Sequence, residues 1–180
     1  GLMCAAQAGL IGKKTLVLER NDKVGAKILI SGGGRCNYTN IGNSPANFIS
    51  ENPDFLHGIF KQWTVDDTIT FFEQYGIVGQ EKTLGQLFPE TNKAKDIVAV
   101  FSKILYETEQ DIALNTLVKS VEKNDNGFMV TVENAKGESR YHAHKVVISS
   151  GGITPSQTIW FECRRYSACT SPFDNNWKRC

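Results

Sequence analysis

Residues 31–37 read Ser-Gly-Gly-Gly-Arg-Cys-Asn and combine the groups best suited to bind an anion. Consecutive glycines lose much backbone entropy on folding, so a fold keeps them where the backbone must come close to something else. Unhindered N–H groups followed by Arg35 suit a phosphate, because backbone nests and charge-assisted donors both favour anions. The alternative is a flexible surface loop. The strand-like run at 15–18, which Glu19 follows directly, favours a nucleotide cofactor instead.

The spacing of Gly1 and Glu19 strengthens that interpretation. In the dinucleotide-binding fingerprint, the third glycine packs a helix against a strand, and an acidic residue about 20 positions later holds the ribose hydroxyls. Gly1 and Glu19 have this separation. We therefore interpret Gly1 as the last glycine of a G-x-G-x-x-G whose first positions, and the strand before them, are absent. Gly1, Ala5 and Gly9 recur every fourth position and predict a helix with one smooth face.

Periodicity predicts the elements that position these residues. Amphipathic helices are expected over residues 64–76 and 93–108, the first of them with Thr64 and Asp67 as a capping box. Residues 41–62 are expected to be a loop with short helical pieces. Strands are expected at 15–18, 84–88, 112–118, 128–133 and 146–149. The pattern ends after Gly152, so residues 153–180 are interpreted as a frameshifted, foreign or unstructured tail.

Composition narrows the class of protein. The chain has 180 residues, of which 41% are hydrophobic and 22% charged, as in ordinary soluble globular proteins. A net charge of +1 gives no reason to expect nucleic acid or a membrane surface, so a small-molecule substrate is expected. Five cysteines without a Cys-x-x-Cys pair fit a reducing cytoplasm and no metal site. The oligomeric state stays open.

Several blocks of the sequence resemble the BaiN-type, or aminoacetone oxidase-type, FAD-binding flavoproteins of bacteria. The most specific block is Lys-Ile-Leu-Ile-Ser-Gly-Gly-Gly-Arg-Cys-Asn at 27–37. Others are Leu-Val-Leu-Glu-Arg at 16–20, Leu-Phe-Pro at 87–89, Thr-Leu-Val at 116–118 and Val-Ile-Ser-Ser-Gly-Gly at 147–152. The resemblance implies an α/β fold: a Rossmann-like FAD-binding domain of the two-dinucleotide-binding flavoprotein type over residues 1–152, incomplete at both ends.

The resemblance also implies a cofactor-binding role for each matching position. Gly1 would lie at the pyrophosphate helix, Glu19 with its neighbour Arg20 at the adenosine ribose, and the backbone of Val118 at the adenine. Gly151 and Gly152 would return the chain to the cofactor. The residues expected to line the pyrophosphate and flavin side are Lys27, Ile28, Ser31, Gly32, Gly33, Gly34, Arg35, Cys36 and Asn37.

Three functions are compatible with this sequence. The first is the FAD-binding part of a flavin-dependent oxidoreductase, with NAD(P)H as a candidate electron donor and this chain alone inactive. The second is a fragment of an NAD-binding dehydrogenase, and the third is a truncated product without activity. No acid–base pair is predicted. Cys36 is either a redox thiol beside the flavin or, as we expect, a packed and unreactive side chain.

Overall fold

The computed structural model describes residues 1–49 and 52–151. The predicted tail at 153–180 and the predicted site residue Gly152 lie outside this range. The elements are, in chain order, α1 (Leu2–Leu10), β1 (Leu16–Leu18), α2 (Ala26–Ile30), η1 (Ser31–Gly33), β2 (Thr39–Asn40), η2 (Pro45–Asn47), α3 (Pro53–Gln62), α4 (Val65–Gln74), β3 (Gly79–Glu81), η3 (Thr83–Gly85), β4 (Gln86–Pro89), α5 (Ala94–Glu107), β5 (Asp111–Ala113), β6 (Leu117–Asn124), β7 (Gly127–Asn134) and β8 (Gly137–Ala143).

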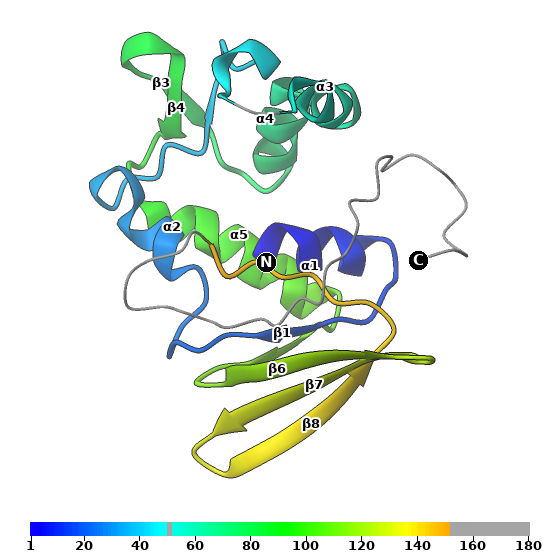
Figure 1. Cartoon of the computed structure of the whole chain (residues 1–180). Coiled ribbons are helices and arrows are strands. Elements are labelled where there is room, and N and C mark those ends of the chain that lie inside the picture. Colours follow the sequence, from blue (N-terminus) through cyan, green and yellow to red (C-terminus); the bar gives the residue numbers. More distant parts are fainter. Residues whose placement is uncertain (50–51, 152–180) are drawn as a thin grey trace.

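The elements form layers around a short parallel pair of strands (Figure 1). β1 pairs in parallel with β5, α1 and α5 lie on one side of this pair, and the antiparallel sheet β6–β7–β8 lies on the other. A second antiparallel sheet, in the order β2–β4–β3, stands with α3 and α4 beyond α5. This mixture of parallel strands, covering helices and antiparallel ribbons confirms the predicted α/β class.

Helix α1 depends on its small residues, as its spacing predicted. Ala5, Ala6 and Gly9 are buried. Gly9 faces the end of α5, where an added Cβ would come within 2.9 Å of Thr108 Cβ, so a larger side chain would push the two helices apart. The helix gives way to a turn at Gly12, whose φ of +72° suits glycine and whose N–H donates to the carbonyl of Gly9 at 2.8 Å.

The predicted helices at 64–76 and 93–108 are confirmed as α4 and α5. Thr64 caps α4: its Oγ1 accepts from the N–H of Asp67 at 3.0 Å, and the Asp67 carboxylate accepts from the N–H of Thr64 at 2.7 Å. The hydrogen bonds that the N–H and the hydroxyl of Thr64 donate to the Asp67 carboxylate hold the pKa of Asp67 below its ordinary value. Gly76, with a φ of +82°, ends the helical segment where the sequence placed the stop.

The core lies where α4 and α5 meet. Ile97, Phe101 and Ile104 of α5 are each 5% exposed or less. Phe72 packs edge-on against Phe101 with ring centroids 5.8 Å apart, and Phe71 is buried beside them. The prediction that these aromatic residues fill the core, and do not stack on a flavin, is consistent with this packing.

Two predicted strands differ from the structure. The strand expected at 112–118 is two strands, β5 and β6, separated by a turn in which Asn115 has a φ of +50°. Residues 146–149 are not a strand in the structure. They are apolar enough for a buried strand, but they have no hydrogen-bonded neighbour within the described ranges, and Val147 and Ile148 are 65% and 58% exposed.

Smaller differences occur elsewhere. Residues 41–62, expected to be mostly irregular, contain the ten-residue helix α3, whose first turn accommodates Pro53. The strand expected at 84–88 begins only at Gln86, because residues 83–85 form a 3₁₀ turn with Leu84 at a φ of +61°. Within the described part of the chain, no helix has the length and apolar character required to cross a membrane.

Truncation of the buried stripe of α5 should destabilise the protein. Ile104 is 1% exposed, so we expect Ile104→Ala to lower the free energy of unfolding by about 2–5 kcal/mol. Tyr106 lies on the same helix and is 85% exposed, so Tyr106→Ala should change it by less than about 0.5 kcal/mol. Urea denaturation followed by circular dichroism measures both values. Equal losses would contradict the assigned face of α5.

Candidate functional site

The glycine turn, residues 31–37, needs its three glycines for their conformations. Gly32, Gly33 and Gly34 have φ values of +55°, +68° and +83°. This left-handed region is strained for residues with a Cβ and accessible to glycine. Gly32 also lies against β4, since an added Cβ would come 3.1 Å from Cε1 of Phe88. At Gly33, no heavy atom of the neighbouring described residues lies within 4 Å of the corresponding position, so the described structure leaves the turn open on that side.

Several polar groups of the glycine turn form hydrogen bonds to carbonyls within the turn itself. The N–H groups of Gly34 and Cys36 both donate to the carbonyl of Ser31, at 3.0 and 3.1 Å, so these two donors are not available to an anion. Arg35 donates through Nε to the carbonyl of Gly32 at 2.8 Å, and its guanidinium carbon lies 5.5 Å from the centroid of the Phe88 ring. The terminal amino groups of this exposed side chain have no protein partner within the described residues.

The turn is also fixed to its neighbours. The first N–H of α5, from Ala94, donates to the carbonyl of Gly34 at 2.8 Å. The side-chain amide of Asn37, oriented to satisfy its surroundings, donates to the carbonyls of Thr39 at 2.6 Å and Leu87 at 3.1 Å. Asn37 therefore ties the turn to β2 and β4.

Cys36 is a packed side chain. It is 5% exposed and belongs to the same buried cluster as Phe71 and Ile97. Burial raises the pKa of its thiol above the ordinary value, and a hydrogen bond with Ser31 opposes this only in part. A protonated, buried thiol is a poor nucleophile. These properties favour the packed interpretation over a redox thiol.

Glu19 lies in one of two loops that follow the parallel strands. We call residues 19–21 and 113–116 the strand-end loops. Backbone hydrogen bonds, each 2.9 Å long, run from Glu19 N–H to the carbonyl of Ala113, from Asn115 N–H to that of Asn21, and from Thr116 N–H to that of Glu19. Carboxyl ends of parallel strands are where open α/β sheets bind their ligands. The two loops therefore form one rigid edge at the predicted ribose position.

One of the two carboxylate oxygens of Glu19 accepts hydrogen bonds from Asn21. Its Oε1 accepts from the N–H of Asn21 at 2.9 Å and from Asn21 Nδ2 at 2.6 Å. Within the described residues, Oε2 has no protein partner. This oxygen is free to accept a hydroxyl.

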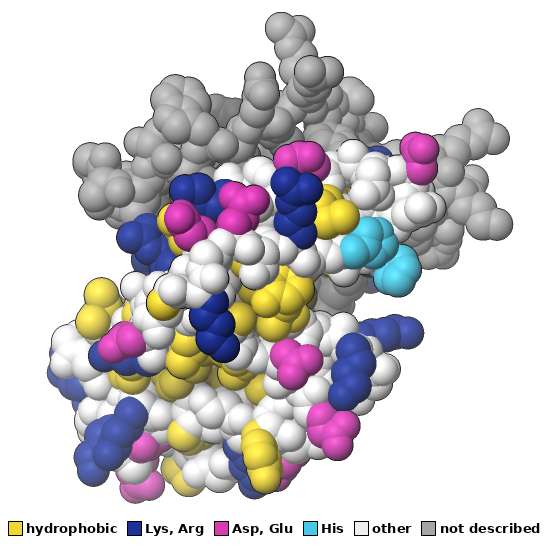
Figure 2. All heavy atoms as spheres, turned by 90° about the horizontal axis from the view of Figure 1, so that it is seen from below, with side chains coloured by type: hydrophobic (Ala, Val, Ile, Leu, Met, Phe, Trp, Pro, Cys, Tyr) yellow, Lys and Arg dark blue, Asp and Glu magenta, His cyan; other side chains and the backbone are white. Residues whose placement is uncertain are grey.

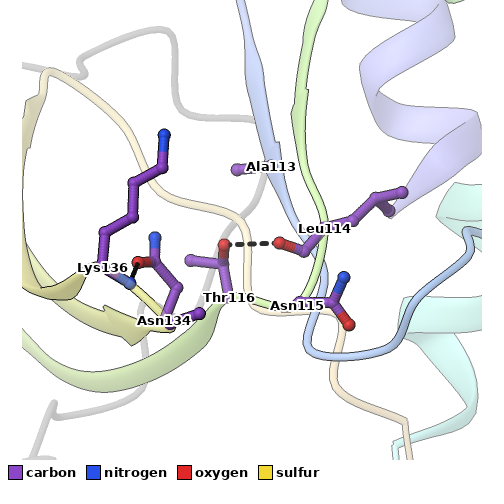
Figure 3. A pocket seen from close by; sticks show the side chains of 7 residues that line it. Ala113, Leu114, Asn115, Thr116, Asn134 and Lys136 are labelled. Carbon is purple, nitrogen blue, oxygen red and sulfur yellow. Dashed lines mark hydrogen bonds between the residues drawn. The ribbon is translucent and has the colours of Figure 1, made fainter.

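A cavity of about 290 Å³ adjoins the strand-end loops (Figure 3). Asn115, Thr116, Asn134 and Lys136 supply its polar side chains, and Thr116 Oγ1 donates to the carbonyl of Leu114 at 2.8 Å. Asn134 is the last residue of β7 and Lys136 lies in the turn that follows it, whereas Thr116 comes from the loop after β5. The cavity thus lies between the parallel strands and the antiparallel sheet.

Comparison with known proteins identifies the fold. The family described as HI0933-like protein Rossmann domain matches residues 1–158. The chain belongs to this family. The predicted resemblance to bacterial FAD-binding flavoproteins is thereby confirmed, and the sequence blocks that carried it are blocks of the HI0933-like Rossmann domain.

Relatives of known activity include three bacterial proteins. Two are named ribosomal RNA dihydrouridine synthase: that of Escherichia coli is 35% identical over 86% of this chain and 37% of its own length, and that of Haemophilus influenzae is 34% identical over 86% and 38%. A 3-dehydro-bile acid delta(4,6)-reductase of Clostridium scindens is 25% identical over 77% of this chain and 33% of its own length. The chain therefore spans between 33% and 38% of the length of these relatives.

The remaining predicted site residues of this HI0933-like domain are spread over several elements. An added Cβ at Gly151 would come 2.5 Å from Nζ of Lys27, which places the end of the described chain against α2 (Figure 1). Gly1 lies beside Ser149, since a Cβ added at Gly1 would come 3.7 Å from the Cβ of Ser149. Arg20 is exposed after β1, and Ile28 packs on the core beneath the glycine turn. Val118 of β6 pairs with Val132 of β7, just beyond the cavity.

Some residues of this edge were not singled out from the sequence. Asn21, Asn115, Asn134 and Lys136 are polar residues in turns, and single turn residues carry no distinctive spacing. Their common feature is that each follows or adjoins a strand end, which becomes visible only once β1, β5 and β7 are placed together. Within the described residues, no cluster of side chains could hold a metal ion.

The two described cysteines should differ sharply in reactivity. Cys4 is exposed, whereas Cys36 is buried with a raised thiol pKa. We expect iodoacetamide at pH 8 to modify Cys4 first and Cys36 only slowly, because burial both shields the Cys36 thiol and raises its pKa. Peptide mass spectrometry resolves the two sites. Equal rates would restore the redox-thiol interpretation.

Proposed function

We propose that the full-length protein is an FAD-dependent oxidoreductase and that this domain holds the adenosine and pyrophosphate parts of the cofactor. The observation that supports it most is a convergence on one side of α1 and β1. Glu19 follows β1 there, with one carboxylate oxygen that has no partner among the described residues, and α2, which carries Lys27, leads on the same side into the glycine turn with Arg35. Family membership points to the same cofactor.

The residues of this chain fit the parts of FAD. The open side of Gly33 lets a phosphate approach the backbone closely, and Lys27 and Arg35 supply positive charge beside it. Oε2 of Glu19 can accept a ribose hydroxyl. The cavity beside Thr116 offers polar groups and space for the adenine, close to the Val118 backbone that the family resemblance implies.

The chain and the cofactor have separate tasks. Bound FAD would supply the hydride chemistry, with NAD(P)H as the candidate electron donor and an organic molecule as the substrate. The residues described here bind and orient: Glu19 fixes the ribose, and the braced glycine turn keeps its shape when an anion arrives. Because the turn is already ordered by Ser31 and Arg35, little further ordering is required on binding.

The names of the relatives favour a reductase. One kind is named for making dihydrouridine in ribosomal RNA and the other for reducing a bile acid, so both names describe the addition of hydrogen. The expectation of a small-molecule substrate without nucleic acid stays a prediction. It rested on a net charge of +1, and that charge belongs to a chain spanning 37% of the Escherichia coli relative. A uridine of ribosomal RNA is therefore the first substrate to test.

The other hypotheses have less support. A nicotinamide-binding dehydrogenase would use Glu19 equally well, but it gives no role to the glycine turn, and the family is one of flavoproteins. A bacterial cytoplasmic location stays a prediction.

Loss of the Glu19 carboxylate should weaken FAD binding. In the full-length protein we expect Glu19→Ala to raise the dissociation constant roughly tenfold to a hundredfold, because a charge-assisted hydrogen bond to the ribose is lost. Glu138 is an exposed carboxylate on β8, and Glu138→Ala serves as the matched control with unchanged affinity. Titration of the apoprotein, followed by flavin fluorescence and visible absorbance, gives the constants. Identical affinity in the Glu19 variant and the parent would refute the ribose assignment.

The substrate class can be tested in cells. In Escherichia coli lacking its own ribosomal RNA dihydrouridine synthase, expression of the full-length protein should restore dihydrouridine, measured by nucleoside mass spectrometry of ribosomal RNA. The Glu19→Ala variant should restore less at equal expression. No restoration by a protein that is purified with FAD would exclude this substrate and leave a small-molecule acceptor.

A further inference from the structure

One neighbouring residue, Asn21, orients the carboxylate of Glu19. Asn21 Nδ2 donates to Glu19 Oε1 at 2.6 Å, and the backbone N–H of Asn21 donates to the same oxygen at 2.9 Å. Both donors therefore act on one oxygen. The carboxylate plane is thus restrained, and Oε2 is left as the oxygen that can accept a new hydrogen bond.

Asn21 is itself held from the other strand-end loop. Its carbonyl accepts from Asn115 N–H at 2.9 Å, and Asn115 adopts a left-handed backbone with a φ of +50°. Positive φ values in residues other than glycine are uncommon and persist where the surroundings enforce them. The chain from β5 through Asn115 to Asn21 and Glu19 is therefore continuous and ordered without a ligand.

From these contacts we propose that Asn21 is the positioning residue of the ribose site: its side-chain amide fixes Glu19 so that Oε2 faces the ribose diol. This inference rests on the proposed function, because it concerns the same cofactor. It adds a residue whose contact is to Glu19 and not to the ligand. Without the amide, the carboxylate can rotate, and the ribose hydroxyls must then order it on binding.

The test separates an effect on the ribose from a general loss of structure. The probes are FAD, ADP and 2′,3′-dideoxy-ADP, titrated into the full-length apoprotein by calorimetry or by displacement of FAD. ADP keeps the ribose hydroxyls and the dideoxy analogue lacks them. The variants are Asn21→Ala, Asn21→Asp, Glu19→Ala and the double variant Asn21→Ala with Glu19→Ala. Asn124→Ala is the matched control, since Asn124 Oδ1 accepts from the N–H of Asn126 in the distant β6–β7 turn.

We expect Asn21→Ala to weaken FAD and ADP by the same factor, about two- to tenfold, and to leave the dideoxy analogue unchanged. Asn21→Asp should weaken them at least as much, because a carboxylate replaces the amide donor beside Glu19. The double variant should bind no more weakly than Glu19→Ala alone, since Asn21 acts through Glu19. The Asn124→Ala control should match the parent with all three probes.

Three results would overturn the inference. Unchanged affinity for FAD and ADP in both Asn21 variants would show that the Asn21 amide does not position Glu19. Equal weakening of ADP and the dideoxy analogue would assign Asn21 a purely structural role. Additive losses in the double variant would mean that Asn21 acts independently of Glu19. If the parent itself bound neither FAD nor ADP, the proposed function would fail, and this inference with it.

Discussion

The backbone hydrogen bonds between the strand-end loops are the constraint on which the candidate site depends. They continue the parallel pairing of β1 and β5 for a few residues beyond the strands, from Glu19 to Ala113 and Thr116 and from Asn21 to Asn115. Because a parallel ladder fixes the register of both chains, it fixes where the two loops begin. The position of the Glu19 carboxylate and the mouth of the neighbouring cavity both follow from this register.

Helix α5 links the glycine turn to helix α1. Its N-terminal N–H, from Ala94, holds the glycine turn through Gly34, and Thr108 just beyond its C-terminus packs against Gly9 of α1. The buried stripe between these ends contacts the aromatic residues of α4. The glycine turn and α1 are therefore held at opposite ends of one well-packed helix.

Local signals in the sequence predicted much of this architecture. The capping box of Thr64 and Asp67, the apolar stripe of α5 and the stop at Gly76 each act within a few residues, so their outcome is visible without tertiary structure. The glycine turn and Glu19 were recognised from residue type and spacing. Residues 146–149 show the limit of this approach: an apolar run becomes a strand only if a neighbour pairs with it. Asn115 was not predicted because its hydrogen bond to Asn21 joins loops more than 90 residues apart in sequence, and Asn21 was not predicted because a single polar residue two positions after Glu19 carries no distinctive spacing.

In the proposed complex, the strand-end loops and the glycine turn face a single FAD. Hydrogen–deuterium exchange of the full-length protein with and without FAD tests it most directly. We predict that FAD slows exchange in residues 19–21, 31–37 and 113–116 together, while the turn between β6 and β7 and the exposed face of α3 keep their rates. Slowed exchange in the glycine turn without any change in residues 19–21 and 113–116, or the reverse, would contradict the claim.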